Sequence, residues 1–301
     1  MKLEEVTRLV DEEHEIQRIA FSPDGKILAG TGLFRARGGS RIALWSVRPF
    51  KKLSSIPTSS DMVNALVYSK DGSLLATGSR DGQIGLWNTR TRRSVRQMQS
   101  HSTDVTSIAF SPSAAVFASA DRSGTIKVWD LSAKRELGTL ASDGWANEIT
   151  FSCDGHQLLC ANESGTIRRW SVPGLESLKS WKQPFPLRDI SLLPDGTELL
   201  ATSTKVAILD ATTGKVLRKL REVRDPSFGF GRVSPDGRLF ATDGIEWGSL
   251  KLFGIQEMKE LCEAGGFSGP ISSVAFSPDN QLLAGSASKP TIIIWEISTA
   301  G

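Results

Sequence analysis

The fold is decided by the stretch His101-Ser-Thr-Asp104-Val105-Thr-Ser-Ile-Ala-Phe110-Ser-Pro112, which is followed by Val116-Phe-Ala-Ser119 and Thr125-Ile-Lys-Val-Trp129-Asp130. Its three apolar runs are rich in residues that favour β-strands, and turn residues separate them. The same unit recurs along the whole chain. A recurring unit has to be identified before any other assignment, because it determines the architecture.

The turn after the first apolar run sets the register of the repeat. Pro-Asp-Gly and Asp-Gly join strands because Pro presets φ and Gly accepts a positive φ. Steps of 41 to 47 residues separate the seven copies. The copies are Phe21-Ser-Pro-Asp-Gly25, Tyr68-Ser-Lys-Asp-Gly72, Phe110-Ser-Pro-Ser-Ala114, Phe151-Ser-Cys-Asp-Gly155, Leu192-Leu-Pro-Asp-Gly196, Val233-Ser-Pro-Asp-Gly237 and Phe276-Ser-Pro-Asp-Asn280.

A tryptophan late in the repeat is the second recurring feature. It appears as Trp45, Trp87, Trp129, Trp170 and Trp295, with Leu209 and Phe253 in its place in copies five and six. With this tryptophan, the turn and the period near 42, the chain resembles the WD40-repeat family over residues 3–297. The resemblance implies an all-β, seven-bladed β-propeller formed by residues 1–301 as a single domain. It says little about function, because one fold hosts many functions.

The family also implies four strands in each blade, named a to d from the channel outward. In blade three we expect them at Val105–Phe110, Ala115–Ser119, Thr125–Trp129 and Glu136–Leu140. Too few residues follow Trp295 for a fourth strand in blade seven. We therefore expect Leu3–Val10 to supply that strand and close the ring, which removes open sheet edges.

Composition bounds the class of protein. The apolar share is 39%, no apolar run approaches the ~18 residues of a membrane span, and the N-terminus lacks an apolar secretion segment. Three cysteines without framework spacing are typical of a reducing compartment. We expect a cytoplasmic protein, with a nuclear location left open. The net charge of +3 is too small to indicate a nucleic-acid partner by itself.

The family often carries a buried hydrogen-bond tetrad of His, Ser or Thr, Asp and Trp. Blade three supplies His101, Ser119 and Trp129, but Ser123 stands at the Asp position, and Asp121 two residues earlier is the substitute. Blade two supplies Thr77, Asp81 and Trp87 without the His, so no blade is expected to have the full set. We favour a structural role over a hydrolase site because buried polar groups need such partners. The sequence indicates no catalytic residue, metal site or cofactor.

The resemblance places the d–a and b–c loops on one face, around the channel mouth. We expect a partner-binding surface there, with Trp145 and Arg188 as its main residues because Trp and Arg dominate binding hot spots. An alternative is that Trp145 folds inward as a plug. The predicted mouth residues are Trp145, Arg188, Trp247, Met62, Asp104, Glu15, Phe34 and Arg35. The neighbouring acidic residues 11–13 are interpreted as solvated surface.

The opposite face gathers positive charge in blades one to three. The residues are Lys51, Lys52, Arg90, Arg92, Arg93, Lys134 and Arg135. They could receive RNA or another polyanion, or serve only solubility. No aromatic residues are interleaved with them, so base stacking is poorly supported.

The favoured function is a non-catalytic scaffold that binds a protein or peptide across the channel mouth, as a monomeric propeller within a larger complex. RNA or polyanion binding on the basic face is the alternative. An enzyme that uses the channel is a minor alternative, which would need a convergent polar cluster.

Overall fold

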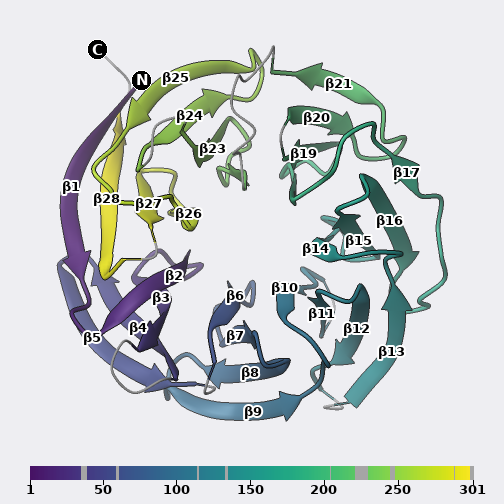
Figure 1. Ribbon diagram of the computed structural model, residues 1–301, viewed down its shortest axis with the longest axis horizontal. Coiled ribbons are helices and arrows are strands. Elements are labelled where there is room, and N and C mark those ends of the chain that lie inside the picture. Colours follow the sequence, from purple (N-terminus) through teal and green to yellow (C-terminus); the bar gives the residue numbers. More distant parts are fainter. Residues whose placement is uncertain are drawn as a thin grey trace.

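The computed structural model shows seven four-stranded antiparallel sheets arranged in a ring (Figure 1). Every regular element in the described part of the chain is a strand, and no helix there is long and apolar enough to cross a membrane. The structure describes residues 1–34, 39–58, 61–113, 115–132, 135–203, 205–220, 230–244, 248–287 and 289–298. The chain is therefore the seven-bladed all-β propeller that the repeat predicts.

The strands of the first three blades follow the order expected from the sequence. They are β2 (His14–Phe21), β3 (Ile27–Phe34), β4 (Ser40–Val47), β5 (Phe50–Pro57), β6 (Val63–Tyr68), β7 (Leu74–Ser79), β8 (Gln83–Asn88), β9 (Arg93–Gln99), β10 (Val105–Phe110), β11 (Val116–Asp121), β12 (Thr125–Asp130) and β13 (Arg135–Ala141). All four predicted strands of blade three are confirmed to within two residues at each end.

Blades four to six are built in the same way, but the outer strand is short in blades four and five and the inner strand is short in blades five and six. They contain β14 (Ala146–Phe151), β15 (Gln157–Asn162), β16 (Thr166–Ser171), β17 (Trp181–Lys182), β18 (Asp189–Leu192), β19 (Glu198–Thr202), β20 (Val206–Asp210), β21 (Val216–Lys219), β22 (Arg232–Val233), β23 (Leu239–Asp243), β24 (Leu250–Gly254) and β25 (Lys259–Ala264). Blade six therefore has the shortest inner strand, with two residues in β22.

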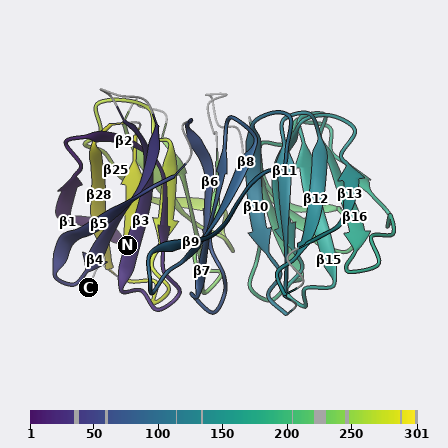
Figure 2. The ribbon, with the colours of Figure 1, turned by 90° about the horizontal axis from the view of Figure 1, so that it is seen from below.

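Blade seven closes the ring with strands from both ends of the chain. It combines β26 (Ser273–Phe276), β27 (Leu282–Ser286) and β28 (Thr291–Ser298) with β1 (Lys2–Val10). The pairing of β1 with β28 is antiparallel and runs from Lys2 opposite Ser298 to Val10 opposite Thr291. Both ribbon views show these two strands side by side (Figures 1 and 2). The predicted closing strand is confirmed.

The core lies between blades rather than within them. Ala76 and Ile84 of blade two pack in one cluster with Val105 and Trp129 of blade three. Trp129 also stacks on Phe117, with 5.9 Å between ring centroids. Strands b and c are buried on both faces by such contacts, which is why their sequences are almost continuously apolar.

Blade six keeps this packing without the repeat tryptophan. Phe253 takes its place and stacks on Phe240 of the neighbouring strand, with 4.9 Å between ring centroids and an interplanar angle of 6°. Both rings are buried, so this stacked aromatic pair fills the space between the blades without a tryptophan.

The repeated turn is held by its own serine and aspartate. Ser22 Oγ donates to Asp24 Oδ1 at 2.6 Å and accepts from the backbone N–H of Ile27 at 2.9 Å. Gly25 follows with a φ of +70°, which favours glycine, and it lies beside Pro278 in the turn of blade seven. The same serine-to-aspartate bond recurs at Ser69, Ser152, Ser234 and Ser277. The serine–aspartate bond thus holds the turn of five blades, and the turn of blade one lies against that of blade seven.

We expect Leu9→Ala to destabilise the closed ring. Leu9 is 6% exposed and packs with Ile16, Trp45 and Ile292, so it joins the first and last blades. Removing a buried leucine side chain should lower the free energy of unfolding by about 2–4 kcal/mol. Val10→Ala is the matched control on the same strand. Val10 is 52% exposed, so its truncation should lower the free energy of unfolding by less than about 1 kcal/mol. Denaturant unfolding would measure both variants. Equal losses of stability would contradict the packing of β1 against the first and last blades.

Candidate functional site: the channel and its mouth

A β-bulge interrupts the innermost strand of several blades near the channel mouth. In β10 the pairing shifts between Val105 and Ser107, and β2, β6 and β14 shift at the equivalent place. A bulge leaves one residue unpaired and changes the direction of its side chain. In β10 this residue is Thr106, whose Oγ1 donates to Ala146 O of the next blade at 2.5 Å. Asn147 of β14 makes the corresponding contact to blade five. The bulged residues therefore join neighbouring inner strands.

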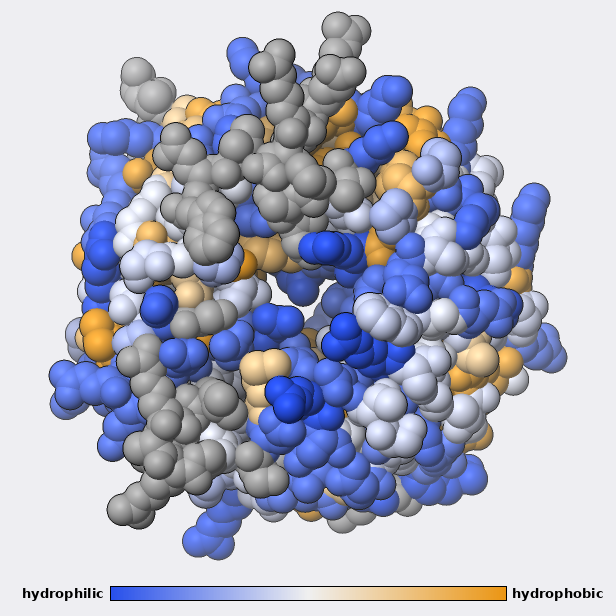
Figure 3. All heavy atoms as spheres, in the orientation of Figure 1, coloured by the Kyte–Doolittle hydropathy of each residue, from blue (hydrophilic) through white to orange (hydrophobic). Residues whose placement is uncertain are grey.

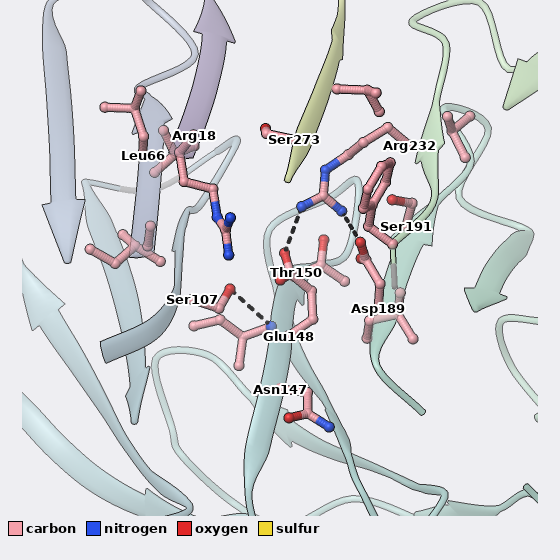
Figure 4. A pocket seen from close by; sticks show the side chains of 18 of the residues that line it. Arg18, Leu66, Ser107, Asn147, Glu148, Thr150, Asp189, Ser191, Arg232 and Ser273 are labelled. Carbon is pink, nitrogen blue, oxygen red and sulfur yellow. Dashed lines mark hydrogen bonds and ion pairs between the residues drawn. The ribbon is translucent and has the colours of Figure 1, made fainter. Parts of the chain in front are cut away.

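The inner strands surround a cavity of about 650 Å³ in the central channel. Hydrophilic residues border much of the central opening on the face shown in Figure 3. The charged residues in the cavity wall are Arg18, Glu148, Arg188, Asp189 and Arg232. Figure 4 shows Arg18 and Arg232 pointing into the cavity, on the side where Glu148 lies. A cavity of this size with a few convergent polar groups is typical of a small-molecule site.

Arg232 joins three blades across the channel. Its Nη1 donates to Asp189 Oδ2 of blade five, and its Nη2 lies 3.9 Å from Glu148 Oε1 of blade four. Burial raises the pKa of both carboxyl groups, and Arg232 offsets this only in part. The Asp189 carboxylate also raises the pKa of Glu148. Arg232 therefore anchors the short inner strand of blade six to a carboxylate pair.

Arg18 is held differently, by backbone carbonyl groups. Its Nε donates to Asn64 O at 2.7 Å, and its Nη1 donates to Gln17 O at 3.1 Å and to Ser272 O at 3.0 Å. These three acceptors belong to blades two, one and seven. Among the described residues, no carboxylate lies within 4.0 Å of its guanidinium nitrogens. Arg18 keeps its charge because an arginine side chain does not deprotonate in proteins.

Four charged residues of the cavity wall were not predicted from the sequence, namely Arg18, Glu148, Asp189 and Arg232. The first three stand three residues before the first turn residue of their blade, where blades two, three and seven have small residues. A charged side chain at a repeat position that carries a small residue in other blades was the available signal. The predicted mouth residues came from other repeat positions and from the b–c loops, so this position was not among them.

At the mouth itself, three side chains form a contact that links blades three and four. Trp145 immediately precedes β14 and is 45% exposed, so it does not fold inward. Arg122, in the turn between β11 and β12, lies over its ring with Cζ 4.3 Å from the ring centroid. Arg122 Nη1 also lies 3.7 Å from Asp104 Oδ2. We call Asp104, Arg122 and Trp145 the mouth cluster. Its Arg122 was absent from the predicted set.

The other predicted mouth residues are dispersed. Arg188 is exposed and lines the cavity, whereas Met62 and Glu15 are half-buried. Three predictions fall outside what the structure describes, namely the side chain of Phe34 and the whole of Arg35 and Trp247. The structure therefore brings together two of the predicted residues, Asp104 and Trp145.

The predicted basic surface is exposed over blades one to three. The exposed residues are Lys51, Lys52, Arg90, Arg92, Arg93 and Arg135, and Lys134 lies outside the described residues. Two of these side chains have partners. Lys52 Nζ lies 3.0 Å from Asp11 Oδ2, and Arg92 Nη1 donates to Ser54 Oγ at 3.1 Å.

The interpretation of residues 11–13 as solvated surface is wrong for Asp11. Its side chain is fully buried, and its Oδ1 lies 2.9 Å from His14 Nδ1. Burial by itself would raise the pKa of Asp11, but His14 and Lys52 outweigh it and hold the pKa below its usual value. Glu13 lies close enough to these groups to complete a set of metal ligands. The Lys52 ammonium group already compensates the Asp11 charge, so we assign the cluster a structural role.

The tetrad of blade three is complete, contrary to the expectation that no blade has the full set. His101 Nε2 lies 2.7 Å from Ser119 Oγ, which accepts from Trp129 Nε1 at 2.9 Å. His101 Nδ1 lies 3.0 Å from Asp121 Oδ2, so Asp121 is the substitute that the sequence suggested. Asp121 Oδ1 also accepts from the backbone of Ser123. Since a carboxylate only accepts hydrogen bonds, the proton of the neutral imidazole lies on Nδ1.

Burial argues against a nucleophilic role for this cluster. Ser119 is completely buried and His101 nearly so, which leaves no access for a substrate. Burial lowers the pKa of His101 although Asp121 opposes the shift, so the ring is neutral at neutral pH. In blade two, Trp87 Nε1 donates to Thr77 Oγ1 at 3.1 Å. Asp81 instead accepts from the backbone N–H of Gln83 and caps its turn. Both networks support the blades.

Comparison with known proteins agrees with the repeat. Residues 50–88, 92–130 and 259–296 match the family model described as "WD domain, G-beta repeat". The chain is similar to Apoptotic protease-activating factor 1 of Danio rerio, with 29% identity over 103 residues, or 34% of this chain and 8% of that protein. It is also similar to Protein HIR1 of Candida albicans and Protein hir-1 of Neurospora crassa. These are 32% and 31% identical over 74 residues, or 25% of this chain and 8% and 7% of theirs.

We expect Ser119→Ala to destabilise the fold because it leaves the Trp129 and His101 ring nitrogens without their shared partner. Each buried unsatisfied group costs about 1–3 kcal/mol, so the free energy of unfolding should fall by about 2–4 kcal/mol. Ser94→Ala, at an exposed position of β9, is the control and should change it by less than about 0.5 kcal/mol. Denaturant titration followed by tryptophan fluorescence would measure both. If Ser119→Ala left the free energy of unfolding unchanged, the tetrad would not be needed for stability.

Proposed function

Because this chain belongs to the WD40-repeat family, we propose that it is a non-catalytic scaffold that binds a protein or peptide partner across the channel-mouth face. The mouth cluster is the observation that carries the proposal. Trp145 is partly exposed and has Arg122 stacked on its ring, so the pair offers an apolar surface next to hydrogen-bond donors. Tryptophan and arginine are the residue types that dominate binding hot spots. We further propose a cytoplasmic or nuclear location and a monomeric propeller within a larger complex.

The geometry of the mouth cluster supports a preformed contact surface. Asp104 restrains Arg122, and Arg122 restrains the ring of Trp145. Restraint before binding reduces the conformational entropy that a partner must remove. Arg188 adds an exposed positive charge on the wall of the cavity, so we expect the partner to carry an acidic or carbonyl-rich segment.

Polyanion binding on the basic surface is the second candidate. Six exposed lysine and arginine side chains over blades one to three support it. Binding to a phosphate backbone would fall steeply with rising salt, because neutralised phosphates release counterions. A flat salt dependence, or no RNA recovered after crosslinking, would reject this candidate.

We expect the double variant Trp145→Ala/Arg188→Glu to lose the partner. A partner would first be captured from lysate with the wild-type protein, then purified and titrated by calorimetry. Hot-spot truncations cost about 2 kcal/mol or more, so the affinity should fall at least about thirtyfold. Arg93→Glu/Val95→Ala on exposed β9 is the matched control, since it makes the same charge change away from the mouth. If only the control variant lost the partner, the basic surface would be the binding site.

A further inference from the structure

The charged residues of the channel cavity are unequal in number. Three arginines and two carboxylates line it, so the wall carries an excess of one positive charge when every group is ionised. Burial shifts both carboxyl groups toward their neutral forms, which increases the excess. The described wall contains no other charged side chain. An uncompensated positive charge in a partly enclosed cavity attracts anions.

The positive charge of Arg18 is less closely compensated than that of Arg232. Arg232 contacts Asp189 and lies 3.9 Å from Glu148. In the described part of the chain, Arg18 donates to backbone carbonyl groups through Nε and Nη1, and Glu148 and Asp189 act on it from beyond 4.0 Å. No hydrogen bond from Nη2 to the described residues is present, and Figure 4 shows the guanidinium group projecting into the cavity. Three carbonyl contacts from three blades fix the orientation of this group. Arg18 is thus a preoriented donor with unused hydrogen-bonding capacity.

We propose that the central channel binds the oxyanion group of a free small molecule, a phosphate or a carboxylate, with Arg18 as the primary contact. A planar guanidinium group matches both oxyanions and holds them by charge-assisted hydrogen bonds. Ser273 and Asn64 lie in the same wall and supply neutral polar groups beside Arg18. The cavity volume of about 650 Å³ is that of a small-molecule site.

This site is separate from the partner surface proposed above. Trp145, Arg122 and Asp104 do not line the cavity, and Arg18 does not belong to the mouth cluster. Arg188 is the residue that both surfaces share. Loss of partner binding in a Trp145 variant would therefore leave the anion site intact, so the two proposals fail independently.

The test is calorimetric titration of the wild-type protein with inorganic phosphate and with citrate at pH 8.5, which covers both oxyanion classes. We expect saturable binding of one stoichiometric equivalent of at least one of these probes. Arg18→Gln should weaken it at least tenfold. Arg93→Gln, which removes one charge from the outer rim, should change it less than twofold. No saturable binding of either probe, or equal weakening by the two variants, would overturn the proposal.

A second variant, Glu148→Gln, tests the proposal even if Arg18→Gln does not fold. Glu148→Gln removes the negative charge that an anion would meet in the cavity and keeps the size of the side chain. Binding should become about three- to tenfold tighter at pH 8.5, the effect of removing one repulsive charge at several ångströms. Unchanged or weaker binding by Glu148→Gln would contradict an anion in this cavity. Movement of the Arg18 Nε–H resonance during the wild-type titration would identify the contact directly.

Discussion

The antiparallel pairing of β1 with β28 is the contact on which the rest of the propeller depends. A four-stranded blade has two apolar faces and can bury them only against its neighbours. In an open row of seven blades, the first and last would each leave one face in water. Pairing of Lys2–Val10 with Thr291–Ser298 places the two ends of the chain in one sheet and gives every blade two neighbours. Leu9 then packs with Trp45 and Ile292 across the closure.

Closure explains why individual blades tolerate departures from the repeat. Blade three has a complete His–Ser–Trp–Asp network, blade two has only its Thr–Trp pair, and blade six substitutes Phe253 for the tryptophan. Apolar clusters that include residues of a neighbouring blade are present in each case. A local polar network therefore adds stability to one blade without being required in all of them.

The same tolerance permits the inner strands to differ around the ring. At one repeat position, blades one, four and five carry Arg18, Glu148 and Asp189, where other blades carry small or apolar residues. Arg232 adds a fourth charge from blade six. These residues break the sevenfold similarity of the channel, and the mouth cluster does the same between blades three and four. Features specific to this protein lie where its repeats differ, since shared positions serve the fold.

By itself the sequence determined the architecture: the number of blades, the strands of blade three, the turn and the closing strand. These features rest on local propensity and on a period repeated seven times, so each copy supports the others. It also identified Asp104 and Trp145 as residues of one face.

Only the tertiary structure decided which charges meet. Arg232 and Glu148 are 84 residues apart in the sequence, and Arg18 reaches backbone carbonyl groups of three blades. Such contacts depend on bulges and on curvature of the ring, which place side chains from different blades in one channel and leave no periodic trace in the sequence.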